Sequence, residues 1–138
     1  MGYLSEIVKI STGAPTAAGT STITGSAIDM AGFDGAMFVV RVGTPATNNS
    51  LKLTQCDTIA GTYADVANTS VGSHATDTPL IVDIQRPTKQ FIKYAVVRGT
   101  STTIDTVCIT QYNARTRSTT MPTNTQIERH LSPSEGTA

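Results

Sequence analysis

The sequence has 138 residues, which is enough for one domain of ordinary size and leaves little room for a second. Ten Lys and Arg residues balance ten Asp and Glu residues, so the formal net charge is zero. The chain therefore lacks the positive field with which binders of nucleic acid and of anionic membranes attract their partners. We predict neither nucleic acid nor a membrane among its partners.

Hydroxyl side chains take the place of charge in this sequence. Only 14% of the residues are charged, against about 25% in a typical soluble domain. In contrast, 25 residues are Thr and 11 are Ser. Thr is β-branched and is enriched in strands. The composition therefore predicts an all-β fold.

Neither targeting features nor cysteine spacing points to a particular function. No apolar run approaches the roughly 20 residues that span a bilayer, and the N-terminus lacks the basic start and continuous apolar stretch of a signal peptide. We expect a protein that is made in a cytoplasm. Cys56 and Cys108 lie within predicted strands, and we expect both as reduced thiols rather than as a disulfide.

The first ten residues carry a group of apolar side chains. Its members are Tyr3, Leu4, Ile7, Val8 and Ile10, and their spacing fits either one short amphipathic turn or an extended arm. Residues 11–20 are Gly, Ala, Pro, Ser and Thr only, which is the composition of a linker. We predict an N-terminal arm and linker over residues 1–19, whose apolar side chains contact a partner or a second copy.

Residues 20–114 show short apolar strands between turns rich in Gly, Pro, Asn and Ser. The strongest strand is predicted over residues 36–42, where both faces are mostly apolar, so we place it centrally in a sheet. The strands are expected at residues 22–28, 36–42, 50–56, 63–66, 80–85, 91–98 and 103–112. Because no helical pattern separates them, the region predicts one domain that is an antiparallel β-sandwich or a small barrel.

After Asn113 the apolar pattern ends. Residues 115–138 contain Thr, Ser, Pro and scattered charges, with only Met121, Ile127 and Leu131 to bury. Such a segment cannot offset the entropy of its own ordering. We therefore predict a C-terminal arm over residues 115–138 that becomes ordered against another surface.

Residues for catalysis or metal binding are sparse. The two histidines, His74 and His130, lie in a polar loop and in the C-terminal arm, and His74 with Asp77 lacks a second ligand pair at a usable spacing. Asp83 and Asp105 fall in predicted strands and could share a face, but aromatic platforms for a sugar are few. We predict no enzyme, no metal and no cofactor.

One local basic group spans a turn and the strand that follows it. It consists of Arg86, Lys89, Lys93 and Arg98. Lys93 and Arg98 are an odd number of residues apart and would point to opposite faces of a strand. We interpret the group as a solvated strand face, with contact to an acidic neighbour in an assembly as the alternative.

Four stretches of the sequence resemble small structural proteins of tailed bacteriophages. They are Ile-Asp-Met-Ala-Gly-Phe-Asp-Gly-Ala-Met-Phe-Val-Val at residues 28–40, Leu-Lys-Leu-Thr-Gln-Cys-Asp at 51–57, Ala-Gly-Thr-Tyr-Ala-Asp-Val at 60–66 and Arg-Pro-Thr-Lys-Gln-Phe-Ile-Lys-Tyr at 86–94. The resemblance covers about residues 20 to 115 and is to capsid decoration, or cement, proteins such as the jelly-roll cement protein of a Bordetella phage. It depends on the order and spacing of strands and turns.

The resemblance implies a jelly-roll sandwich that binds the outside of a phage head as a homodimer or homotrimer and clamps neighbouring major capsid proteins. It would place the protein on the virion surface and carries no catalytic residues. Two alternatives stay open. One is a carbohydrate- or cell-surface-binding sandwich, for which Phe33 and Tyr63 would be the stacking aromatics, and the other is a structural protein of the tail or neck.

Overall fold

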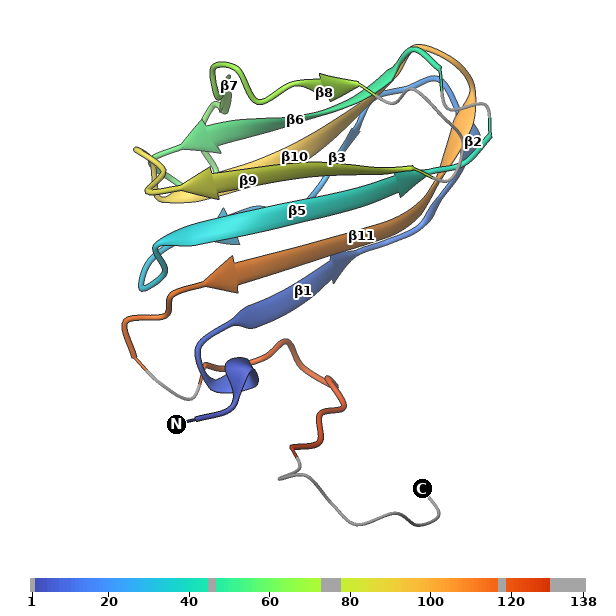
Figure 1. The fold of residues 1–138 in the computed structure, drawn as a ribbon. Helices are drawn as coiled ribbons and strands as arrows, with labels where there is room; N and C mark the ends of the chain where they lie inside the picture. Colours follow the sequence, from blue (N-terminus) through green and yellow to red (C-terminus); the bar gives the residue numbers. More distant parts are fainter. Residues whose placement is uncertain (1, 45–46, 73–77, 117–118, 130–138) are drawn as a thin grey trace, which may run out of the picture.

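The protein is a β-sandwich in which two antiparallel sheets pack against each other (Figure 1). The computed structural model describes residues 2–44, 47–72, 78–116 and 119–129. One short 3-10 helix, η1 (Leu4–Glu6), precedes the strands, and no helix in these ranges is long and apolar enough to cross a membrane. The prediction of an all-β antiparallel sandwich is confirmed.

The first sheet has five strands, and its order is β1-β11-β5-β9. β2 pairs with β11 beyond the end of β1, so β1 and β2 together follow one edge of the sheet. Figure 1 shows β9, β5, β11 and β1 side by side. The strand bounds are Lys9–Gly13 for β1, Thr16–Gly19 for β2, Gly35–Val42 for β5, Pro79–Gln85 for β9 and Thr102–Tyr112 for β11.

The second sheet has six strands in the order β3-β10-β6-β7, with β4 beside β10 and β8 beside β6. Its two long strands, β6 and β10, are in direct register from Phe91 opposite Cys56 to Arg98 opposite Asn49. The bounds are Ile23–Thr24 for β3, Ile28–Asp29 for β4, Asn49–Cys56 for β6, Ala64–Asp65 for β7, Val71–Gly72 for β8 and Phe91–Arg98 for β10.

The core lies between the sheets and follows the period of two in each long strand. In β5, Phe38, Val40 and Val42 are fully buried while Met37 and Val39 stay half-buried on the opposite face. β5 lies between β11 and β9, so the predicted central position is confirmed. The remaining inward positions on β6, β9, β10 and β11 complete one continuous apolar cluster.

The segment expected as a linker forms strands. Residues 9–13 and 16–19 are β1 and β2, and both pair with β11. Thr, Ser and Ala fit an edge strand because a long central partner supplies the ladder, so tertiary pairing overrides the linker composition. The N-terminal region is therefore part of the first sheet from Lys9 onward.

Two other expected elements differ in detail. The strand expected at residues 22–28 is interrupted at Gly25, where the ring of Tyr94 occupies the space that a Cβ would need. The segment expected as a polar loop after residue 68 contributes β8, which pairs with β6. Both differences arise from contacts distant in sequence, which a local pattern does not contain.

Candidate interaction surface

The structure separates the five apolar N-terminal residues that were predicted as contacts. Leu4 in η1 is 70% exposed and Ile10 in β1 is 43% exposed. Tyr3 and Ile7 are half-buried. Val8 is 5% exposed and belongs to the buried interior. Leu4 and Ile10 are therefore the members of the group that a partner can reach without rearrangement of the fold.

The N-terminal segment is held by the segment that follows β11. The backbone N–H of Thr119 donates to the carbonyl of Glu6 at 3.3 Å, and the Thr119 hydroxyl donates to the carbonyl of Val8. Nε of Arg129 donates to the hydroxyl of Ser5 at 2.6 Å. Figure 1 shows the two segments together below β1. Residues 119–129 thus order the N-terminal segment within the same chain, while residues 130–138 lie outside the described part of the protein.

The outer face of the first sheet contains a patch that is poor in charge, while Arg41 and Asp105 are exposed elsewhere on the same face. Direct cross-strand neighbours form two rows across β1, β11, β5 and β9. The first row is Thr12, Cys108, Val39 and Ile81, and the second row, next to the first, is Ile10, Thr110, Met37 and Asp83. We call these two rows the first-sheet face. Ile81 is 48% exposed, and Met37, Val39 and Cys108 are half-buried. Asp83 is the one ionised side chain of the two rows, so most of this face can be covered without desolvating a charge.

Asp83 itself is engaged at the margin of the face. It accepts a hydrogen bond from the Tyr112 hydroxyl at 2.6 Å. Burial, this hydrogen bond and the charge of Asp83 together raise the pKa of Tyr112 to about 12. Asp105 accepts a hydrogen bond from the Thr103 hydroxyl instead. Both carboxylates lie on the outer side of the first sheet, but each accepts a hydrogen bond from a different hydroxyl. They therefore do not form an acid–base pair.

The outer face of the second sheet has a different character. Lys52 forms an ion pair with Asp65 at 2.9 Å. The Nζ of Lys93 lies 4.1 Å from the centroid of the Tyr63 ring, within the range of a cation–π contact. The charges on this side are thus matched by groups of the same chain, and the face offers a solvated polar surface rather than an apolar one.

A pocket of about 480 Å³ opens at one end of the sandwich, where the turn between β4 and β5 meets the turn between β9 and β10. The backbone N–H of Arg86 donates to the Asp34 carbonyl at 2.7 Å and joins the two turns. Arg86 has a φ of 51°. This left-handed conformation is uncommon for a residue other than Gly, Asn or Asp.

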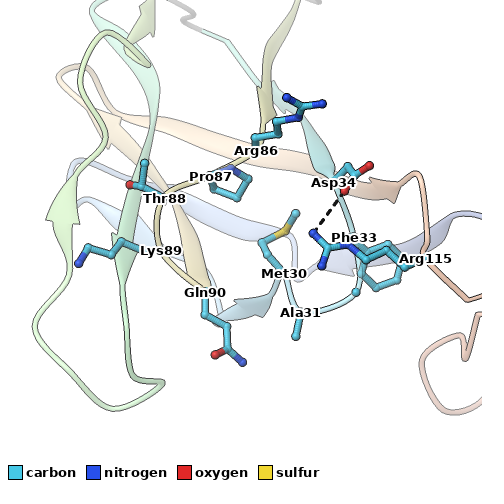
Figure 2. A pocket seen from close by; sticks show the side chains of 11 residues that line it. Met30, Ala31, Phe33, Asp34, Arg86, Pro87, Thr88, Lys89, Gln90 and Arg115 are labelled. Atoms are coloured by element: carbon cyan, nitrogen blue, oxygen red, sulfur yellow. Dashed lines mark ion pairs between the residues drawn. The ribbon is translucent and has the colours of Figure 1, made fainter.

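The cations that line this end pocket do not converge. Figure 2 shows Arg115 directed toward Asp34, an ion pair of 3.5 Å, and Lys89 directed away from both. Lys89 pairs with Asp57 at 2.6 Å, and that hydrogen bond raises the pKa of its ammonium group. Two of its three cations are paired with carboxylates and the third, Arg86, is exposed, so the pocket lacks the converging cations of an anion site.

The predicted basic group is divided by the fold. Lys89 and Lys93 are engaged as described above, and Arg86 is exposed in its turn. Arg98 is buried, at 5% exposure, and donates to the carbonyls of Ser21, Ala17 and Thr102 at 2.7 to 2.8 Å. The interpretation as a solvated strand face is wrong for Arg98. Its burial was not predictable because its carbonyl partners come from distant segments.

The residues that the structure describes show no cluster of metal-ligating side chains. No group of three or more His, Cys, Asp or Glu side chains in these ranges is arranged to hold a metal ion. Cys56 and Cys108 are both free thiols. His74, Asp77 and His130 fall outside the described residues, so their predicted lack of a role stays a prediction.

Comparison with known proteins gives no assignment. No known protein-family model matches the chain, and no curated protein is significantly similar to it. The function must therefore be argued from the surfaces themselves.

Proposed function

We propose that this chain is a non-enzymatic structural protein that lies on the outside of a tailed-phage head and stabilises the shell by binding neighbouring major capsid proteins. The observation that carries the proposal is the first-sheet face, a surface with one charged residue among two rows of cross-strand neighbours. A protein whose work is adhesion needs such a surface. Ile10 is an exposed apolar residue of this face, and Leu4 is a second exposed apolar residue in the N-terminal segment that leads into β1.

The size of the face suits a lattice. Two rows of four residues, on four strands spaced about 4.8 Å apart, cover roughly 250 Å². An interface of two such faces buries about 500 Å², which is below the usual size of a specific complex. One contact of this size is weak, but a repeating shell multiplies the contacts and raises the overall avidity. The face thus supports binding to an ordered surface, or to a second copy on it.

The strand order supports a jelly roll. We count β1 with β2, β3 with β4 and β7 with β8 as interrupted strands, which leaves eight strand positions along the chain. One sheet then has the order first, eighth, third, sixth, and the other has the order second, seventh, fourth, fifth. This nesting of two Greek keys is typical of jelly rolls, a fold that recurs in viral capsid proteins and in lectins. The fold alone does not decide between these functions.

The aromatic residues argue against the glycan-binding alternative. Phe33 is half-buried against the core cluster. One face of the Tyr63 ring carries the Lys93 ammonium group, and its hydroxyl donates to the Ile59 carbonyl at 3.0 Å. Sugar binding needs exposed aromatic rings on which a pyranose can stack. Neither ring is presented in this way, so the capsid proposal is preferred.

Heads that lack this protein provide the test. They should release DNA at a lower temperature than complete heads, and adding the purified protein should restore the original temperature. In the same assay, Leu4→Asp should lower the amount of bound protein, while Ile59→Asp, at an exposed turn position away from the first-sheet face, should not. Heads that are equally robust with and without the protein would contradict the proposal.

A further inference from the structure

A second pocket, of about 330 Å³, opens at the side of the sandwich between the edge strand β1 of the first sheet and the β3–β4 edge of the second. We call it the side slot. Ile23, Ile28 and Ile109 supply apolar walls, and none of its lining residues carries a charge at neutral pH. The side slot lies between the sheets rather than on the outside of one, and it shares only Thr12 with the first-sheet face.

Two hydroxyl groups at the side slot are not used by the fold. Tyr94 is 4% exposed, and its hydroxyl has no hydrogen-bond partner among the described residues. The Ser11 hydroxyl, which also lines the slot, is buried and equally without a partner. Burial raises the pKa of Tyr94, so its phenol stays a neutral donor. Buried polar groups are nearly always satisfied, so the orphaned Ser11 hydroxyl requires an explanation, while Tyr94 lines the same slot without a hydrogen bond inside the protein.

Glycines on both sides make room for the Tyr94 ring. A Cβ on Gly25 would lie 2.0 Å from a ring carbon, and a Cβ on Gly13 would lie 2.2 Å from the hydroxyl oxygen. The ring therefore fits its present position only because both neighbours lack side chains. The fold holds the Tyr94 hydroxyl at the slot without giving it a bond inside the protein.

The backbone of β1 is only half covered at this edge. The Thr119 hydroxyl meets the Val8 carbonyl, and the N–H of Ile10 donates to Sδ of Met121 at 3.4 Å. By the alternation of an antiparallel ladder, Thr12 presents its N–H and C=O on the same side as Ile10. Neither group of Thr12 has a partner in the described ranges. Thr119 and Met121 of the C-terminal segment thus cover the edge at Val8 and Ile10, and the edge stays uncovered at Thr12, beside the side slot.

We propose that the side slot binds an extended, uncharged segment of a partner protein, which adds to the β1 edge at Thr12, inserts one aliphatic side chain between the sheets and offers hydrogen-bond partners to the Ser11 and Tyr94 hydroxyls. Strand addition of this kind takes its affinity from main-chain hydrogen bonds and its specificity from the side-chain pocket. A charged segment is excluded because it would lose its hydration in a slot that offers no counter-charge. The inference does not depend on the proposed shell binding, since it concerns the backbone edge of β1 and the space between the sheets rather than the outer side chains of the first-sheet face.

The direct test is a titration of the isotopically labelled full chain with the blocked pentapeptide Thr-Val-Thr-Val-Thr, followed by nuclear magnetic resonance. The amide signals of Thr12 and Gly25 should shift together and saturate at millimolar peptide. A control peptide with Asp in place of Val should leave them unmoved. If the Thr-Val-Thr-Val-Thr peptide causes no shift, or if both peptides cause equal shifts, the proposal is overturned.

Substitutions in the chain separate binding from folding. Thr12→Pro removes the outward N–H at an edge position where proline is tolerated, and it should weaken peptide binding about five- to tenfold relative to Thr12→Val, which keeps the N–H. Tyr94→Phe and Ser11→Ala should weaken it about three- to tenfold without loss of thermal stability, because each hydroxyl lacks a partner in the free protein. If Thr12→Pro fails to fold, these two variants decide the matter. Unchanged peptide affinity in both would contradict the inference.

Discussion

The guanidinium group of Arg98, at the end of β10, donates hydrogen bonds from Nε and Nη2 to the carbonyl and hydroxyl oxygens of Ser21, 77 positions earlier in the chain. Its Nη1 donates to the carbonyls of Ala17 and Thr102 at 2.8 Å each. One buried side chain thereby joins β2 and Ser21 to the start of β11. The positive charge is stabilised by carbonyl dipoles of the backbone.

Replacement of Arg98 should therefore be costly. Arg98→Met should lower the free energy of unfolding by about 2–4 kcal/mol, because it leaves several carbonyls without donors in the interior. Chemical denaturation of the variant measures this change. Arg115→Met is the matched control, since Arg115 is 73% exposed in its ion pair and its loss should cost less than about 1 kcal/mol. Equal stability of the two variants would show that the Arg98 contacts contribute little.

The packing of Tyr94 between glycines gives a second prediction. Gly25→Ala should destabilise the protein by about 1–3 kcal/mol, because the new methyl group overlaps the ring and forces it or the backbone to move. Gly72→Ala is the control, since its Cβ would come no nearer than 3.8 Å to another atom. The midpoints of thermal unfolding compare the two. A Gly25→Ala protein as stable as the Gly72→Ala protein would refute the close packing at β3.

Stability at high pH should depend on Tyr112. Burial, the hydrogen bond to Asp83 and the charge of that carboxylate raise the folded-state pKa of Tyr112 from 10.0 to about 12. Because the folded pKa is the higher one, the stabilisation is complete below pH 10.0 and is lost as the pH rises toward about 12. Ultraviolet difference titration should show one phenol that ionises in this upper range. Tyr112→Phe should remove that step, and its persistence in the variant would contradict the assignment.

A charged substitution in the first-sheet face should weaken binding to heads while leaving the stability of the fold almost unchanged. Ile81→Lys should change the free energy of unfolding by no more than about 0.5 kcal/mol because the side chain is already exposed. It should lower binding to heads at least about tenfold, since the ammonium group would be covered by an apolar partner. Ile59→Lys, at a position 63% exposed in the turn after β6, is the control. Equal head occupancy of the two variants would remove the first-sheet face from the mechanism.

Much of the fold was predictable because its long strands carry a period of two. The alternation over residues 36–42 predicted both the strand and its central place, since its two faces are apolar. Residues 9–19 were not predictable in the same way. Their Thr, Ser and Ala residues carry no apolar alternation, and they become strands only because the long β11 offers them a ladder.

The surfaces were less predictable than the core. Apolarity alone singled out Val8 together with Leu4, although the first is buried and the second is exposed. The first-sheet face joins residues from four strands whose neighbourhood is set by topology, so no local window contains it. The side slot depends on the absence of side chains at Gly13 and Gly25 and on an orphan hydroxyl, which a sequence pattern does not reveal.

The central claim is that this protein works by lying against other polypeptides in an ordered shell. Electron cryomicroscopy of the phage head tests it most directly. The account predicts one sandwich-shaped density per copy on the outer surface of the head, with the first-sheet face turned toward a neighbouring chain. A head without this density, or a density whose first-sheet face is turned to solvent on every side, would contradict the claim.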